Sequence, residues 1–196
     1  VGTAFSIALY LIGFAESFNG YFDLGMSVNS FRITGTIALV LLTALALIST
    51  SVALKAQFFI LGAIVISLVS IFFGTSEFAP ETIPLMSTQG SVSMEVVFAI
   101  FFPAVTGFTA GIAMSGDLKD PKYSIPLGTL SAIGVGLIVY IVLAVYMAKN
   151  INADLLKTDY NILMKIAFFA PAVVAGIWGA TLSSALGGIL GGPRIL

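Results

Sequence analysis

The sequence contains neither cysteine nor histidine among its 196 residues. Without cysteine the chain can form no disulfide and perform no thiol chemistry. Without either residue it lacks the usual ligands of zinc and haem and the base of a histidine-dependent catalytic triad. These absences argue against an enzyme, and no cofactor is expected.

Charge is also scarce. Charged residues occupy 9% of the positions and hydrophobic residues 59%, whereas a soluble domain carries about 25% charged residues. A chain this apolar cannot cover itself with polar surface, so the lipid bilayer is its expected surrounding. The net charge of −1 provides no basic surface for nucleic acid, which is not expected as a partner.

Long apolar runs predict about six transmembrane helices, since one crossing needs about 20 residues. They are expected at residues 1–22, 33–51, 58–73, 94–116, 127–147 and 166–190. The runs are continuous rather than alternating, which favours helices over barrel strands and predicts an all-α integral membrane protein. A polar link at Lys55–Gln57 is expected to join the second and third helices, and Pro126 to begin the fifth. The abrupt ends predict a fragment of a longer membrane protein.

Helix-breaking residues interrupt the fourth run in the stretch "FFPAVTGFTAG". Pro103 removes a backbone donor and Gly107 weakens the next turn, which predicts a break near residues 106–108. In a broken helix, free carbonyls at the end of the first half suit a cation, and free amides at the start of the second half suit an anion. Such helices form midplane sites in secondary transporters. A simple proline kink fits the same pattern.

Three motifs point to a known family. "FFPAVTGFTAGIAMSGDLKDPKYSIPLGTL" resembles the sixth-helix signature of cation-chloride cotransporters, which belong to the amino acid-polyamine-organocation superfamily. "ALYLIGFAESF" is similar to the third helix of that family and "GATLSSALGGILGGPRIL" to the eighth. The resemblance implies helices 3 to 8 of an inverted-repeat transporter fold with broken helices. Helices 1, 2 and 9 onward would be missing, so the fragment alone is not expected to transport.

The resemblance also implies ion-binding positions. Oxygen atoms at the potassium site would come from Tyr10, Pro103 and Thr106. Backbone amides at the chloride site would come from Gly107, Phe108 and Thr109. Sodium would be bound by the Ala180 carbonyl and by the hydroxyls of Ser183 and Ser184.

Further expectations follow from the same resemblance. Glu16 would form a gating ion pair with an arginine of the absent first helix, and the loop at residues 117–122 would be cytoplasmic. From the residues alone, Tyr10 fits a packed aromatic side chain equally well, and the two serines fit helix packing in which they bond back to their own helix. Glu16 is suspect on physical grounds, because an ionisable group within a span costs about 2.5 kcal/mol or more.

The resulting hypothesis is electroneutral symport of chloride with sodium, potassium or both, in a multi-pass protein of the plasma membrane. The "LSSAL" hydroxyls favour sodium coupling within the family pattern, and Tyr10 favours potassium as well. The full-length protein is a candidate for homodimer formation. Two alternatives stay open: an amino acid or polyamine permease of the same superfamily, and a structural membrane subunit that transports nothing.

Overall fold

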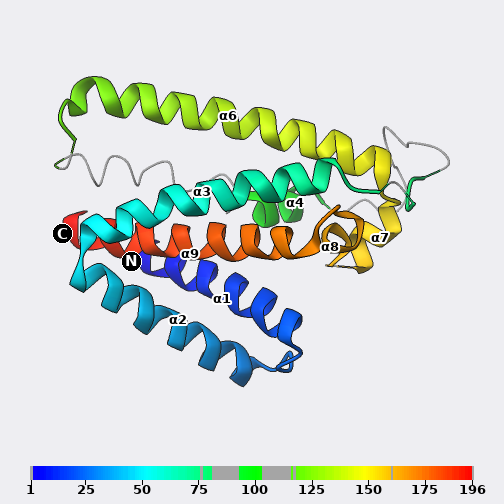
Figure 1. The fold of residues 1–196 in the computed structure, drawn as a ribbon, viewed down its shortest axis with the longest axis horizontal. Helices are drawn as coiled ribbons and strands as arrows, with labels where there is room; N and C mark the ends of the chain where they lie inside the picture. Colours follow the sequence, from blue (N-terminus) through cyan, green and yellow to red (C-terminus); the bar gives the residue numbers. More distant parts are fainter. Residues whose placement is uncertain are drawn as a thin grey trace. The chain divides into compact units, whose positions relative to one another are not determined.

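The computed structural model describes residues 2–75, 77–80, 93–102, 116, 118–159 and 161–195. Within these ranges the regular structure is helical and no strand occurs (Figure 1). The chain divides into two compact units, one formed by Val1–Gly74 with Leu163–Leu196 and the other by Thr75–Ile162. The expected all-α class is therefore confirmed.

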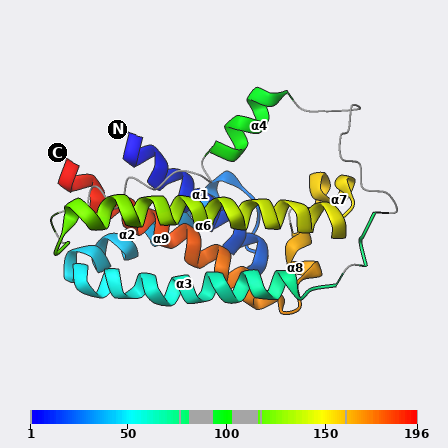
Figure 2. The same ribbon diagram turned by 90° about the horizontal axis from the view of Figure 1, so that it is seen from above.

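The first unit is built around one long helix from the end of the chain. Its long helices are α1 (Gly2–Phe22), α2 (Val28–Ile48), α3 (Thr50–Phe72) and α9 (Ala170–Ile195). Helix α9 lies beside both α1 and α3, and α2 packs mainly on α1, as two perpendicular views show (Figures 1 and 2). The contact between α1 and α9 joins segments from opposite ends of the sequence, and both carry predicted site residues.

Small residues allow these helices to approach closely. A Cβ atom on Gly176 of α9 would overlap the Ser67 side chain of α3, and one on Gly179 would lie 3.0 Å from Ile60 Cγ2. On the α1 side, a Cβ on Gly13 would lie 3.9 Å from Thr181 Cγ2. Glycine at such points is typical of membrane helix packing, where close backbone approach supplies the van der Waals contact.

A single serine ends one helix and begins the next. The Ser49 amide donates to the Leu45 carbonyl at 3.1 Å and closes α2, while its hydroxyl accepts from the Val52 amide at 3.2 Å and caps α3. The prediction of a polar link at Lys55–Gln57 is wrong, because these residues lie inside α3. The N-cap hydroxyl decides the position of the turn rather than the more conspicuous charged segment.

The sixth predicted span also begins differently. The short helix α8 (Ile162–Ile166) is followed by a non-helical segment at 167–169, and α9 starts only at Ala170. Ser70 of α3 binds this segment twice, since its hydroxyl donates to the Phe169 carbonyl at 3.0 Å and accepts from the Phe169 amide at 2.8 Å. These bonds satisfy backbone groups that the interruption would otherwise leave without partners.

The second unit contains α4 (Met94–Phe101), α6 (Pro121–Asn150) and α7 (Ala153–Thr158). The rings of Phe101 and Tyr140 meet edge to face with centroids 5.4 Å apart, which brings the C-terminal end of α4 to α6. Helix α6 starts at Pro121 and includes Pro126 in its interior. The expectation that Pro126 begins this helix is therefore wrong: Pro121 takes the first helical turn, where a missing amide donor costs nothing.

Four helical segments in the described ranges are long and apolar enough to cross a membrane. They are Val28–Ile48, Lys55–Phe72, Pro121–Asn150 and Ala170–Pro193. Helix α1 has 21 residues but is not among them; it carries Glu16 and Asn19. The protein is thus a multi-pass integral membrane protein. The predicted fourth span is helical at Met94–Phe101, and its predicted break lies outside the described residues.

Candidate ion-binding site

The predicted potassium and chloride positions lie mostly where the structure gives no description. Pro103, Thr106, Gly107, Phe108 and Thr109 all fall outside the described residues. The break near residues 106–108 and its two ion sites therefore stay predictions. Tyr10, Glu16 and the three predicted sodium ligands belong to the first unit and are described.

Tyr10 lies on α1 and is partly buried. It packs against a core formed by Leu11, Phe14, Ala38 and Ala185, to which α1, α2 and α9 contribute. This packing agrees with the structural interpretation of Tyr10 as a packed aromatic residue. It also fixes the ring beside α9, so a role for its hydroxyl in ion binding stays open as a prediction.

The three predicted sodium ligands share one face of α9. Ala180, Ser183 and Ser184 are spaced three and four residues apart, which brings them to the same side of the helix. Ala180 and Ser183 are partly buried and Ser184 is exposed. Helix α3 contacts α9 at Gly176 and α1 contacts it at Thr181, and helical geometry puts Ser184 on the strip between these contacts.

The hydroxyl groups of Ser183 and Ser184 differ from the hydroxyl group of the nearby Thr181 in their hydrogen bonding. Thr181 bonds back to its own helix, at 2.8 Å to the Ile177 carbonyl and 3.1 Å to the Trp178 carbonyl. Within the described residues, neither Ser183 nor Ser184 makes a side-chain hydrogen bond. The alternative in which both serines bond back to their helix is therefore not what the structure has. Two hydroxyl oxygens are left with free lone pairs on one face.

Glu16 is exposed on α1. Among the residues that the structure describes, no Lys or Arg nitrogen lies within 4.0 Å of its carboxylate. An exposed carboxylate on a helix packed among spans needs either a partner or water. The described residues supply no such arginine partner for Glu16, so the gating pair stays a prediction.

Three features that involve α1 were not predicted from the sequence. Asn19 is fully buried and accepts a 2.8 Å hydrogen bond from the Thr34 hydroxyl, and Trp178 donates to the Ser17 hydroxyl at 3.2 Å within a group of aromatic rings. The third is a groove between α1 and α2 that contains Arg32. In the sequence, the sign of this groove is Arg32, a single charged residue between the apolar residues Phe31 and Ile33.

The described ranges contain no group of three or more Asp, Glu, His or Cys residues placed to hold a metal ion. The oxygen atoms on α1 and α9 belong to hydroxyls, backbone carbonyls, the Asn19 amide and a single carboxylate. Neutral oxygens of this kind suit hard monovalent cations bound weakly enough to leave again.

Comparison with known proteins gives a consistent result. Residues 1–196 match the family model described as "Amino acid permease". The chain is 31% identical to mouse solute carrier family 12 member 8 over 96% of its length, and 28% identical to mouse solute carrier family 12 member 1 over 98%. It spans only 28% and 23% of these relatives' own lengths. The resemblance to the cation-chloride cotransporter family that the three motifs indicate is confirmed.

Proposed function

Because the chain belongs to the amino acid permease family, we propose that it is part of a secondary active transporter of the plasma membrane. The proposed reaction is electroneutral symport of chloride with sodium, potassium or both. The solute carrier family 12 relatives support this class, and nothing in the proposed cycle is enzymatic. This chain spans about a quarter of the length of these relatives, so the proposed transport cycle would belong to a longer protein.

One observation supports the cation site best. Among the residues that the structure describes, Ser183 and Ser184 have no hydrogen-bond partner for their hydroxyls, and both lie on the face of α9 that also carries Ala180. A sodium ion prefers several oxygen ligands, and neutral ones release it again during the cycle. Because Ser184 is exposed, a further helix could reach its hydroxyl and complete the coordination. The first helix of the fold is the proposed source.

Potassium and chloride binding are proposed for the other half of the site. Tyr10 would contribute its hydroxyl from α1, together with Pro103 and Thr106. The chloride would bind the amides of Gly107, Phe108 and Thr109. Since part of each proposed site would lie on helices outside this chain, the isolated 196-residue piece is expected not to transport.

The direct test uses the full-length protein reconstituted in liposomes. Chloride-dependent uptake of radioactive rubidium, measured with and without sodium, is expected for the parent protein. The variant Ser183→Ala/Ser184→Ala should lose sodium dependence, because both free hydroxyls are removed. Thr181→Val is the matched control, since its hydroxyl is already bonded to its own helix. Sodium-dependent rubidium uptake that is unchanged by the double variant would overturn the sodium site.

A second candidate is a permease for amino acids or polyamines, favoured by the description of the matching family model. In it the broken helix would bind a substrate carboxylate in place of chloride. Labelled amino acids and polyamines added to the same liposomes distinguish the two. Uptake of an organic substrate without chloride-dependent rubidium uptake would favour the permease. Stable assembly with no uptake of any kind would favour a structural subunit.

A further inference from the structure

A groove of about 670 Å³ lies between α1 and α2. Its lining is almost entirely apolar: Ala4, Ile7, Ala8, Leu11, Ile12, Val28, Phe31, Gly35 and Leu39 form it together with Arg32 and Thr36. Close approach of the helices at Gly35, where a Cβ would lie 3.7 Å from the Leu11 carbonyl oxygen, forms its floor. Both helices belong to the first unit, so the groove does not depend on how the two units are arranged.

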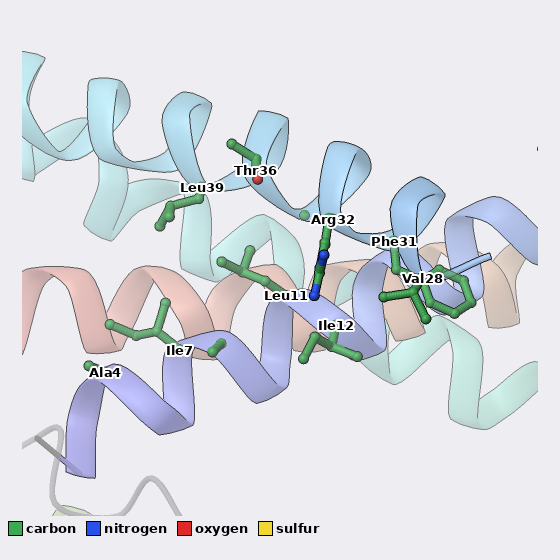
Figure 3. A pocket seen from close by; sticks show the side chains of 11 residues that line it. Ala4, Ile7, Leu11, Ile12, Val28, Phe31, Arg32, Thr36 and Leu39 are labelled. Carbon is green, nitrogen blue, oxygen red and sulfur yellow. The ribbon is translucent and has the colours of Figure 1, made fainter. Parts of the chain in front are cut away.

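Arg32 is the one charged residue of the groove. Figure 3 shows its side chain directed from α2 toward α1, with Leu11 and Ile12 on the facing helix. No carboxylate of the described residues lies within 4.0 Å of its guanidinium, and it makes no hydrogen bond with them. A guanidinium presents a fork of donors that fits phosphate or carboxylate oxygens. The groove therefore offers an unused anion-binding group at one end of an apolar channel.

We propose that this groove binds one anionic phospholipid, with its phosphate on Arg32 and an acyl chain along the apolar lining. Two properties are required together. A soluble anion would gain nothing from the apolar walls, and a lipid without net charge would leave the positive charge of Arg32 uncompensated. Helix α2 is also an apolar membrane span of which only Ala38 is buried within this chain, and this favours lipid as the occupant of the groove.

The position of Arg32 fits a lipid headgroup. It is the fifth residue of α2 (Val28–Ile48), about 6 Å along the helix axis from its start. Leu39 lines the groove about 10 Å deeper. Thr36 follows Arg32 by one turn on the same face and makes no hydrogen bond with the described residues. Its hydroxyl is placed to donate to an ester oxygen below the phosphate, while the chain runs past Ile7 and Leu39.

The test uses the full-length protein, delipidated in detergent and titrated with defined lipids while bound lipid is counted by native mass spectrometry. Palmitoyl-oleoyl phosphatidylglycerol should bind more tightly than palmitoyl-oleoyl phosphatidylcholine. Arg32→Gln should weaken phosphatidylglycerol binding about tenfold or more, the loss expected for a charged hydrogen-bonding contact. Lys55→Gln is the matched control, because Lys55 lies on α3 outside the groove. The Lys55→Gln variant should bind phosphatidylglycerol as tightly as the parent protein does.

A second variant separates the charge from the shape of the groove. Ala8 is exposed and lines the channel, so Ala8→Phe should block the acyl chain and reduce lipid binding with Arg32 intact. Equal binding of the two phospholipids, or unchanged binding by Arg32→Gln, would overturn the proposal. Oleate bound as tightly as phosphatidylglycerol would show that a free fatty acid is the occupant instead. A photocrosslinker at Ile12 that captures protein and no lipid would show that another segment fills the groove.

Discussion

The Thr34 hydroxyl of α2 donates a 2.8 Å hydrogen bond to the side-chain oxygen of Asn19 on α1, and Asn19 is completely buried. The Nδ2 group of the same amide has no partner among the described residues. The bond is thus the one side-chain contact that satisfies Asn19 in this part of the chain. It also fixes the register of α1 against α2 close to the groove.

Thr34→Val should destabilise the protein by about 1–3 kcal/mol, because it keeps the side-chain shape and leaves a buried amide wholly unsatisfied. Unfolding of the full-length protein in mixed micelles measures the change. Thr36→Val is the matched control, since Thr36 is exposed on the same helix and makes no hydrogen bond with the described residues. The double variant Asn19→Leu/Thr34→Val should recover part of the loss. Equal stability of the Thr34 and Thr36 variants would contradict the importance of this bond.

Ser70→Ala should expose the backbone of the segment before α9. The Ser70 hydroxyl both donates to and accepts from Phe169, so its removal leaves two backbone groups without partners. Hydrogen exchange of the full-length protein should show faster exchange at the Phe169 amide. The Phe168 amide is an internal control, because it donates to the Ser70 backbone carbonyl at 2.9 Å, which the substitution retains. Unchanged exchange at Phe169 would show that other contacts hold this segment.

Apolar run length predicted the class of the fold correctly, since hydrocarbon accepts few other structures than a helix. Apolar run length did not predict the residues at which the helices begin and end. Lys55 was expected in a loop because it is charged, yet the turn forms at Ser49, where one hydroxyl caps α3. Pro126 was expected to begin a helix, yet α6 starts at Pro121. The length of an apolar run indicates that a segment lies in lipid. The residue at which a helix begins is decided by local caps and by the backbone donors.

The candidate site was predictable only through the family resemblance. Spacing alone puts Ser183 and Ser184 on one face of α9, but it does not show whether their hydroxyls are bonded back to the helix. That difference from Thr181 appears only in three dimensions. The contacts of Asn19 with Thr34 and of Ser70 with Phe169 join residues 15 and 99 positions apart. A single sequence carries no signal for such pairs.

Gly176→Ala should disturb the contact between α3 and α9, because the new methyl group would overlap Ser67. Overpacking of this kind costs about 1–3 kcal/mol. Gly187→Ala is the matched control on the same helix, since a Cβ there would meet nothing within 4 Å. The yield of monodisperse full-length protein after heating measures both. Ser67→Gly should partly rescue Gly176→Ala, and failure of this rescue would place the clash elsewhere.

Tyr10→Phe separates the two interpretations of Tyr10. The ring packs against the core formed by Leu11, Phe14, Ala38 and Ala185, and phenylalanine keeps that packing while it removes the hydroxyl. If Tyr10 only packs, rubidium uptake by the full-length protein should be unchanged. If its hydroxyl binds the cation, the half-saturating rubidium concentration should rise about tenfold, since a contact to a charged group contributes roughly 1.5–3 kcal/mol.

We expect the second result, with unfolding of the Tyr10→Phe variant close to that of the parent. Tyr21→Phe is its control, because Tyr21 is exposed on the same helix and contacts Trp178 edge to face at 5.6 Å between ring centroids. A hydroxyl that binds potassium should affect the half-saturating concentration of rubidium and leave that of sodium nearly unchanged. Equal effects on both cations would mean that Tyr10 acts on the site through helix packing, and the potassium assignment would then be abandoned.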